Sequence, residues 1–505
     1  MSSSHRTKRD RPSPPPPPPS DLNEEQARGW RLVMEEGKSV FVTGRAGCGK
    51  SYLVKRLVTA LREQLGDSHV YVTAATGIAA CNVGGVTLHS FAGIGLGKDD
   101  VKTLVRKINR YTNVKERWQR AKVLVVDEIS MIDAALLDKL NNIAKAVRNN
   151  DAVWGGIRLI FVGDFFQLPP VSPDEDNPKF FAFDAECWEK TDTKDGVIAP
   201  DCVIDLRTQM RQQDDATFTS LLNKLRVGMV PSNAKQLLYG AGSGLRALED
   251  KGIQPTKLFP HNATVDRVNK QKLQELSGEP LVFTAKDTGT KAGKAQLNKN
   301  CRVPTTVTLK VGAQVMLLRN LAQSIGLVNG VQGVVESFEW ATAAKKRRLP
   351  LVRFFTQHHG QQMRLLDRSK WEIKVGRRVI AKRMQVPLRL SYAITIHKSQ
   401  GMTIHALDVN LEGVFAPGQA YVALSRAVSL DRVRVRNFNP SVIQFNEDVL
   451  RFYYTVAKHN QQRKAHPVVV QRSSKRPRCS SVSVEVVNLT TTPAQQPQQQ
   501  LVTTM

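Results

Sequence analysis

The sequence predicts an α/β fold built around a parallel sheet, followed by a small β-rich region. Four apolar runs of strand length, residues 39–44, 69–76, 122–128 and 158–164, alternate with helix-like segments. Their apolar character is continuous, which is typical of strands covered on both faces and therefore of a parallel sheet. Short Val-rich runs broken by glycine lie between residues 301 and 385 and predict a small β-barrel.

Length and charge narrow the class of protein. The chain has 505 residues, of which 41% are hydrophobic, a length and composition typical of about three domains with buried cores. Lys and Arg number 73 against 45 Asp and Glu, a net charge of +28. Residues 1–20 carry a net +3 and residues 461–505 a net +5, which leaves +20 between them. This excess predicts a polyanion partner, most commonly nucleic acid, unless the lysines only increase solubility.

Several classes of protein are excluded. The six cysteines are scattered, with no C-x-x-C pair and no nearby pair of histidines at zinc-ligand spacing. We therefore expect neither a disulfide framework nor a zinc site. No stretch approaches the roughly 18 apolar residues that a membrane span needs, and residues 1–20 lack an apolar signal core. We expect no membrane association and no secretion by the ordinary route.

Both ends of the chain are predicted to be disordered. Residues 1–20 contain six consecutive prolines and form a Pro-rich leader, and residues 461–505 form a basic tail rich in Ser, Thr and Gln. The run SSKRPR at 473–478 resembles a nuclear import patch, and a tail that only adds DNA affinity is the alternative. A mitochondrial leader is the other possibility for the acid-poor start, but the prolines disfavour an amphipathic helix. We expect the nucleus, with the mitochondrion as the alternative.

A phosphate-binding loop follows the first predicted strand. The residues GRAGCGKS fit the pattern G-x-x-x-x-G-K-[ST] and precede the helix-like segment 51–65. In that setting backbone N–H groups cradle phosphates, Lys50 reaches the β- and γ-phosphates, and Ser51 presents its hydroxyl to Mg²⁺. ATP and Mg²⁺ are therefore the expected ligands. The predicted ATP-binding residues are Gly44, Arg45, Ala46, Gly47, Cys48, Gly49, Lys50 and Ser51.

Polar side chains also follow the next two predicted strands. Asp127 and Glu128 come directly after the run KVLVV, at the strand end where open α/β sheets bind ligands. Asp127 is expected to hold Mg²⁺, and Glu128 to polarise the attacking water. The following strand ends in GDFFQLPPV, which places Asp164 and Gln167 beside the same phosphates. A surface acidic pair and an ordinary polar loop are the structural alternatives.

Taken together, these motifs resemble those of the petite integration frequency helicases, superfamily-one DNA helicases related to RecD and phage Dda. The resemblance runs from about residue 22 to 460, and its most specific stretch is 136–171. It implies that Gln26 reads adenine, that Arg211 and Arg426 are arginine fingers, and that Gln167 is catalytic. Cys48 stands where the family usually has Thr, a position that contributes its backbone.

The resemblance also implies a domain plan of two RecA-like P-loop NTPase domains with an SH3-like β-barrel inserted in the second. The interval 336–385, including KKRR at 345–348, resembles no assigned part of the family. The predicted limits are 21–200 for the first domain with a small insertion at about 89–118, 201–300 with 386–460 for the second, and 301–385 for the barrel.

The function implied is that of an ATP-dependent DNA helicase moving 5′ to 3′ on single-stranded DNA, with duplex or forked DNA as substrate, acting as a monomer in replication, repair, recombination or at telomeres. The DNA-binding residues implied are Thr76, Gly77, His89, Phe91, Asn262, Thr395, His397 and Lys398. Periodicity alone favours a core position for Phe91 and a buried polar role for His397. The competing functions are a non-unwinding nucleoprotein remodeller, a transporter-type ATPase and a scaffold with a vestigial ATP site. A nucleotide kinase would not explain the later segments that also resemble the family, at 206–228, 258–269, 390–404 and 421–427.

Overall fold

The structure, a computed structural model, describes residues 16–170, 180–188, 196–250, 252–301, 303–341, 347–356, 360–375 and 378–465. The chain divides into two units, residues 1–461 and 462–505, and the features below belong to the first. Most of the predicted leader and tail, and part of the KKRR run, lie outside the described residues. Among the described residues no helix is long and apolar enough to cross a membrane.

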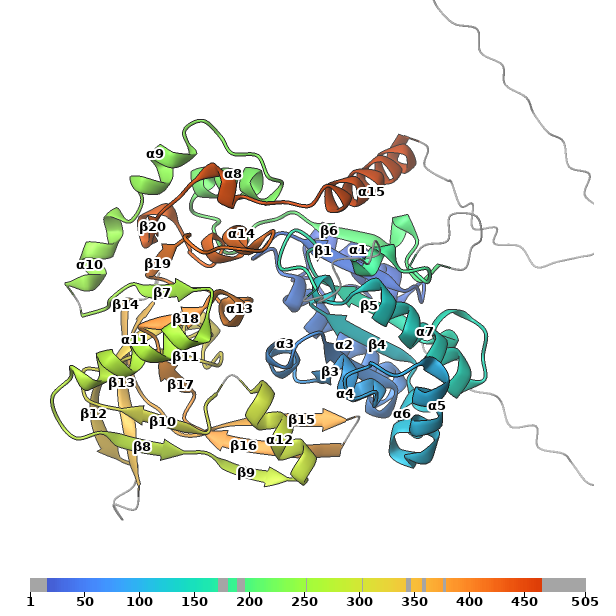
Figure 1. The fold of residues 1–505 in the computed structure, drawn as a ribbon, viewed down its shortest axis with the longest axis horizontal. Coiled ribbons are helices and arrows are strands. Elements are labelled where there is room, and N and C mark those ends of the chain that lie inside the picture. The colour runs from blue at the N-terminus through green and yellow to red at the C-terminus, as the bar shows by residue number, and fades with distance from the viewer. Residues whose placement is uncertain are drawn as a thin grey trace, which may run out of the picture. The chain divides into compact units, whose positions relative to one another are not determined.

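A six-stranded parallel sheet with the order β3-β2-β4-β5-β1-β6 forms the first half of the molecule (Figure 1). Its central strands are buried along their length, because their apolar runs are covered on both faces. This confirms the predicted α/β class and the four predicted strands. The strands are β1 (Val40–Gly44), β2 (Val70–Ala74), β3 (Val86–Thr87), β4 (Val123–Asp127), β5 (Arg158–Val162) and β6 (Val203–Leu206).

Several helices of this half, among them α1 and α7, begin at side-chain caps. Asn23 and Gln26 form a capping box at the start of α1, and Asp133 accepts the N–H of Leu136 at the start of α7. α7 ends at Asn149, whose φ of 50° is left-handed. The helices are α1 (Glu24–Met34), α2 (Lys50–Leu65), α3 (Gly77–Asn82), α4 (Leu88–Ala92), α5 (Val101–Arg110), α6 (Thr112–Arg120) and α7 (Ala134–Arg148). Together with the sheet they enclose the first hydrophobic core.

A second parallel sheet, of four strands in the order β18-β7-β19-β20, has its own hydrophobic core. Its strands are β7 (Thr256–Phe259), β18 (Ala393–Thr395), β19 (Leu407–Asn410) and β20 (Val433–Arg436). Its helices are α8 (Ala216–Arg226), α9 (Ala234–Tyr239), α10 (Arg246–Glu249), α11 (Asn262–Gln274), α13 (Ile396–Ser399) and α14 (Gln419–Leu424).

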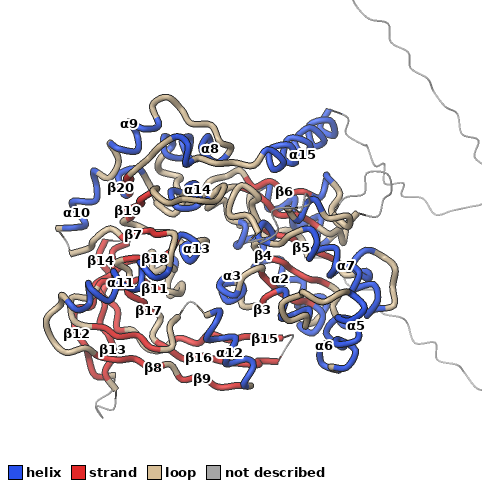
Figure 2. The backbone as a smooth tube through the Cα atoms, in the orientation of Figure 1, coloured by secondary structure: helices blue, strands red, loops and turns tan. Residues whose placement is uncertain are grey.

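Antiparallel strands occupy the interval between β7 and β18 and enclose a third core (Figure 2). They form three sheets, with the orders β14-β13-β12-β11-β17, β15-β16-β9 and β10-β8. The strands are β8 (Leu281–Thr284), β9 (Lys286–Gly289), β10 (Thr306–Leu309), β11 (Gln314–Leu317), β12 (Gln332–Trp340), β13 (Arg348–Thr356), β14 (Gly360–Leu365), β15 (Ser369–Val375), β16 (Arg378–Gln385) and β17 (Leu388–Leu390), with α12 (Lys291–Asn300) after β9.

The last helix, α15 (Glu447–Ala465), follows the second sheet but packs on the first core. Phe452 stacks on Phe183 with ring centroids 4.6 Å apart, and it also contacts Phe165 at 5.5 Å. Tyr453 stacks on Phe166 at 4.9 Å. The chain therefore passes from the first core to the second and returns at its last described helix.

Candidate active site

The phosphate-binding loop joins β1 to α2. Gly44 is the last residue of β1, and the left-handed Gly49 (φ 87°) caps the helix that begins at Lys50. The ammonium group of Lys50 donates to the carbonyl oxygens of Gly44 at 2.6 Å and Arg45 at 3.0 Å. Lys50 thus folds over its own loop, where a phosphate could take the place of these carbonyl groups.

The remaining loop residues are held by packing. The Cys48 side chain is buried, and its contribution to a ligand through the backbone stays a prediction. A Cβ built on Gly47 would lie 2.6 Å from the Cβ of Arg211, and Gly47 accepts the N–H of Met210 at 3.0 Å. Only glycine permits this close approach, with its φ of 86°. The segment after β6 therefore lies directly against the phosphate loop.

Gln26 lies beside the same loop. It is the third residue of α1, and the oxygen of its side-chain amide accepts the backbone N–H of Asn23. The nitrogen of the same amide lies 3.5 Å from the carbonyl oxygen of Gly49. Its side chain is 5% exposed. The structure brings the predicted adenine reader to the edge of the phosphate loop, and its role as an adenine reader stays a prediction.

Asp127 and Glu128 lie at the end of β4, half-buried. The Asp127 carboxylate accepts the N–H of Glu128 at 2.9 Å, and Glu128 adopts the left-handed φ of 55°. Burial raises the pKa of both carboxyl groups, and the neighbouring Asp127 raises that of Glu128 further. The amide of Gln400, from the end of α13, donates to Glu128 at 3.0 Å. The second half of the chain thus contacts the predicted water-polarising carboxylate.

The oxygen atoms available suit Mg²⁺. Among the described residues no group of three His, Cys, Asp or Glu side chains could hold a metal by itself. Mg²⁺ usually takes one or two protein oxygens and completes its shell with phosphates and water. The Ser51 hydroxyl at the start of α2 and the Asp127 carboxylate at the end of β4 would supply two such oxygens, since magnesium is a hard cation that prefers oxygen.

Of the two predicted arginine fingers, Arg426 is buried and Arg211 is half-buried. Arg426 donates to the carbonyl oxygen of Val422 at 2.8 Å and to the hydroxyl of Ser425 at 2.7 Å. Arg211 donates to Thr403 at 2.9 Å and to the carbonyl oxygen of Ser425 at 2.8 Å. Burial lowers the pKa of both guanidinium groups, and Arg426 lowers that of Arg211 further. Neither forms an ion pair with a described residue, so an incoming anion would stabilise both.

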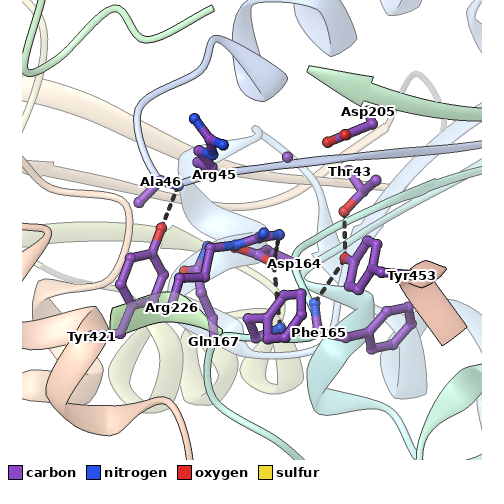
Figure 3. A network of polar contacts seen from close by, with 12 residues as sticks. Thr43, Arg45, Ala46, Asp164, Phe165, Gln167, Asp205, Arg226, Tyr421 and Tyr453 are labelled. Atoms are coloured by element: carbon purple, nitrogen blue, oxygen red, sulfur yellow. Dashed lines mark hydrogen bonds and ion pairs between the residues drawn. The ribbon is translucent and has the colours of Figure 1, made fainter. Parts of the chain in front are cut away.

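Sequence reasoning missed a buried network around Asp164 and the loop that follows β5 (Figure 3). Asp164 forms an ion pair with Arg226 at 2.7 Å, and Gln167 donates to the same carboxylate at 3.2 Å. The Arg226 charge holds the pKa of Asp164 below its ordinary value, although burial alone would raise it. Asp164 is therefore engaged within the protein instead of projecting freely toward a phosphate.

Two tyrosines extend this network to the phosphate loop and β1. Figure 3 shows the Tyr421 hydroxyl directed at Ala46, whose N–H donates to it at 3.1 Å. The Tyr453 hydroxyl lies 2.6 Å from the Thr43 hydroxyl. Tyr421 begins the run YVALSRA at 421–427, but its partner lies 375 residues away in the sequence, so no local signal identified this contact.

The predicted DNA-binding residues lie partly beside the first parallel sheet and partly beside the second. Thr76 and Thr395 accept backbone N–H groups at the starts of α3 and α13, just after strands of the first and second sheets. His397 and Lys398 lie half-buried on α13. Gly77 is the first residue of α3 and His89 lies on α4. Asn262 begins α11, and its side chain lies outside the described residues.

The structure corrects the prediction that Phe91 binds DNA. Its ring is 0% exposed and lies 5.1 Å from both Tyr71 and Trp118. The prediction that it contacts DNA is therefore wrong for this structure, because α4 presents its apolar face to the first core. The alternative, a core position, is the one observed.

Comparison with known proteins connects this geometry to one family. Residues 21–236 match the PIF1-like helicases, and residues 294–338 match the 2B domain of DNA helicase Pif1. The chain is 41% identical over 441 residues to ATP-dependent DNA helicase PIF1 of Xenopus laevis, in an alignment that covers 86% of this chain and 65% of that protein. It spans a little less than two thirds of the length of the curated relatives it matches.

Solved structures agree with this result. The crystal structure of Pif1 helicase from Candida albicans is 38% identical, with a TM-score of 0.67, over 86% of this chain and 99% of that chain. Pif1 from Bacteroides sp in complex with ADP-AlF4 is 28% identical, with a TM-score of 0.71, over 87% of this chain and 97% of that chain. The Bacteroides protein has also been solved bound to single-stranded DNA, at 27% identity and a TM-score of 0.55, over 87% of this chain and 98% of that chain. Because the Candida chain is matched over nearly its whole length, this chain belongs to the Pif1-like helicases.

Proposed function

We propose that this protein is an ATP-dependent DNA helicase. The observation that carries the proposal is that groups of the second core reach the phosphate loop and the catalytic carboxylate of the first. Tyr421 binds Ala46, and Gln400 binds Glu128. An ATP site lined by two cores couples hydrolysis to their relative movement, which is what a translocating motor requires.

In this proposal Lys50 and the loop amides bind the β- and γ-phosphates, and Ser51 and Asp127 hold Mg²⁺. The metal ion would neutralise charge on the phosphate oxygens. Glu128 orients and polarises the attacking water, while Arg211 and Arg426 stabilise the charge that develops on the transferred phosphoryl group. Among the residues that the structure describes, neither guanidinium group has an acidic partner at ion-pair distance, which supports this role because an incoming anion would stabilise both charges.

The proposed polymer substrate is single-stranded DNA, with duplex or forked DNA unwound ahead of the moving protein. The name of the Xenopus relative and the DNA-bound structure of the Bacteroides protein support DNA as the substrate. The net charge of +20 between the two ends supports a polyanion. The family resemblance alone supports the finer parts of the proposal. These are movement from 5′ to 3′, action as a monomer, and roles in replication, repair, recombination or at telomeres.

The test is ATP hydrolysis by the full chain with and without single-stranded DNA, at a stated salt concentration. Lys50→Ala should abolish DNA-stimulated hydrolysis, and Lys55→Ala, an exposed lysine on the same helix, should not. Duplexes with 5′ or 3′ single-stranded tails then test unwinding and its direction. Binding of DNA without any hydrolysis would contradict the motor and leave a scaffold, and hydrolysis without unwinding would favour a nucleoprotein remodeller.

The proposed compartment is the nucleus, on the basis of the run 473–478, which lies outside the described residues. A fluorescent fusion should concentrate in the nucleus, and replacement of Lys475 and Arg476 by Ala should disperse it. Mitochondrial accumulation of the unaltered fusion would contradict the proposal and support the alternative.

A further inference from the structure

Asp164 is a buried carboxylate at the start of the loop that carries Gln167. Its side chain is 0% exposed and accepts hydrogen bonds from the Nε of Arg226 at 3.1 Å and the Nη2 at 2.7 Å. It also accepts the Gln167 amide at 3.2 Å and the backbone N–H of Phe166 at 3.2 Å. The orientation of the Gln167 amide in this structure is therefore set by a carboxylate whose own position is set by Arg226.

Arg226 connects two parts of the molecule. It is the last residue of α8, and the apolar face of that helix, including Phe218 and Leu222, packs in the second core. Its guanidinium nevertheless binds Asp164, at the end of β5 in the first sheet, and lies 4.3 Å from the centroid of the Phe166 ring. A shift of α8 relative to the first sheet must therefore move this guanidinium or break the ion pair.

The other side of the loop is fixed by the last helix. The Tyr453 hydroxyl accepts the N–H of Phe165 at 3.3 Å and contacts the Thr43 hydroxyl, one residue before the phosphate loop. The Tyr453 ring stacks on Phe166 and lies 5.4 Å from the Arg226 guanidinium carbon. With this side anchored, a shift of α8 reaches the loop at two places, the ion pair of Asp164 and the side chain of Leu168, which packs in the second core with Phe218. Of these two, Asp164 is the one that binds the Gln167 amide.

We propose that Arg226 is a positioning residue for ATP hydrolysis, which orients Gln167 through Asp164 and so transmits the position of α8 to the γ-phosphate. The proposal rests on the proposed function, because it assigns Arg226 a part in the same reaction. A bidentate arginine suits this task, since its planar fork holds both carboxylate oxygens in one orientation, whereas lysine contributes a point charge.

The experiment compares Arg226→Lys, Gln167→Ala and the double variant in DNA-stimulated ATP hydrolysis by the full chain. The matched control is Arg383→Lys, because Arg383 is also buried and binds the two oxygens of Asp287 at 2.9 and 2.6 Å, in the antiparallel region. Both arginine variants should lose thermal stability to a similar degree. Only Arg226→Lys should lower kcat, by about ten- to a hundredfold, with a KM for ATP within about twofold of the unaltered protein.

The double variant tests whether Arg226 affects hydrolysis through Gln167. If Arg226 acts through Gln167, the double variant should hydrolyse ATP no more slowly than Gln167→Ala alone. Multiplied losses, or a kcat for Arg226→Lys equal to that of Arg383→Lys, would overturn the proposal. Should Arg226→Lys fail to fold, Asp164→Asn keeps the shape of the pair and is compared with Asp287→Asn in the same way. Absence of hydrolysis in the unaltered protein would instead refute the proposed function and, with it, this role.

Discussion

Replacing Gly47 by alanine should separate the phosphate loop from the first arginine finger. The new Cβ would lie 2.6 Å from the Cβ of Arg211, about 1 Å closer than the usual contact between two carbon atoms. The backbone of Arg211 must therefore move by about 1 Å, a displacement that can lower a rate by about a hundredfold. The left-handed backbone of residue 47 adds about 1–2 kcal/mol of strain.

Gly84 provides a control for the strain. Its φ is 67°, and a Cβ built there meets nothing within 4 Å, so Gly84→Ala introduces strain without a clash. We expect Gly47→Ala to lower kcat for DNA-stimulated ATP hydrolysis by about a hundredfold and Gly84→Ala to leave it unchanged. Equal kcat values for the two variants, at comparable losses of stability in urea, would refute the reasoning. In an Arg211→Ala background the Gly47→Ala effect on kcat should shrink, because the displaced finger is already absent.

Three further predictions follow from single contacts. Tyr421→Phe removes the acceptor for the Ala46 N–H and should cost about 1–3 kcal/mol of stability, together with a loss of kcat/KM for ATP. The control, Tyr392→Phe, removes a similar buried acceptor for the backbone N–H of Gln314 and should lose stability only. Unchanged kinetics for Tyr421→Phe would count against a role of this contact at the ATP site. Phe91→Ala should cost about 3–5 kcal/mol in urea denaturation and leave DNA affinity unchanged in fluorescence anisotropy; a selective loss of affinity would restore the DNA role. Burial and the neighbouring His261 lower the pKa of His397 below its ordinary value of 6.5. The unfolded chain therefore binds a proton at a higher pH than the folded protein does, and the folded protein should lose stability as the pH falls below 6.5. His397→Gln should reduce this loss in denaturation curves compared at about pH 7.5 and 5.5, and an identical loss in both proteins would argue against the assignment.

Local patterns in the sequence were sufficient for the first sheet and the phosphate loop. Residues 40–44 and 123–127 are strands because each is a short apolar run, and Gly49 and Lys50 follow from one motif in which neighbouring residues act together. The side chains that join distant segments had no such pattern. Arg226 lies 62 residues from Asp164, and nothing in LRVG distinguishes a buried ion pair from a solvated helix end.

For Phe91 a sequence motif was present, but it predicted the wrong environment for the side chain. Its motif resembles a DNA-contacting segment. Its burial, however, depends on ring contacts with Tyr71, which precedes it in the sequence, and Trp118, which follows it. The pairing of β9 with β16 is also long-range, since residues 286–289 meet residues 381–384. Periodicity carries information over one helix or one hairpin, and these contacts exceed that range.

The return of α15 to the first core gives the two parallel sheets two covalent connections in place of one. The chain crosses once after β6 and again before Glu447. A body held by a single flexible tether can translate and twist freely, but one held at two points is restricted mainly to rotation about the line between them. The structure therefore favours a hinge over a free slide. A cut in the chain between β20 and α15 would remove this restriction without touching any residue of the ATP site.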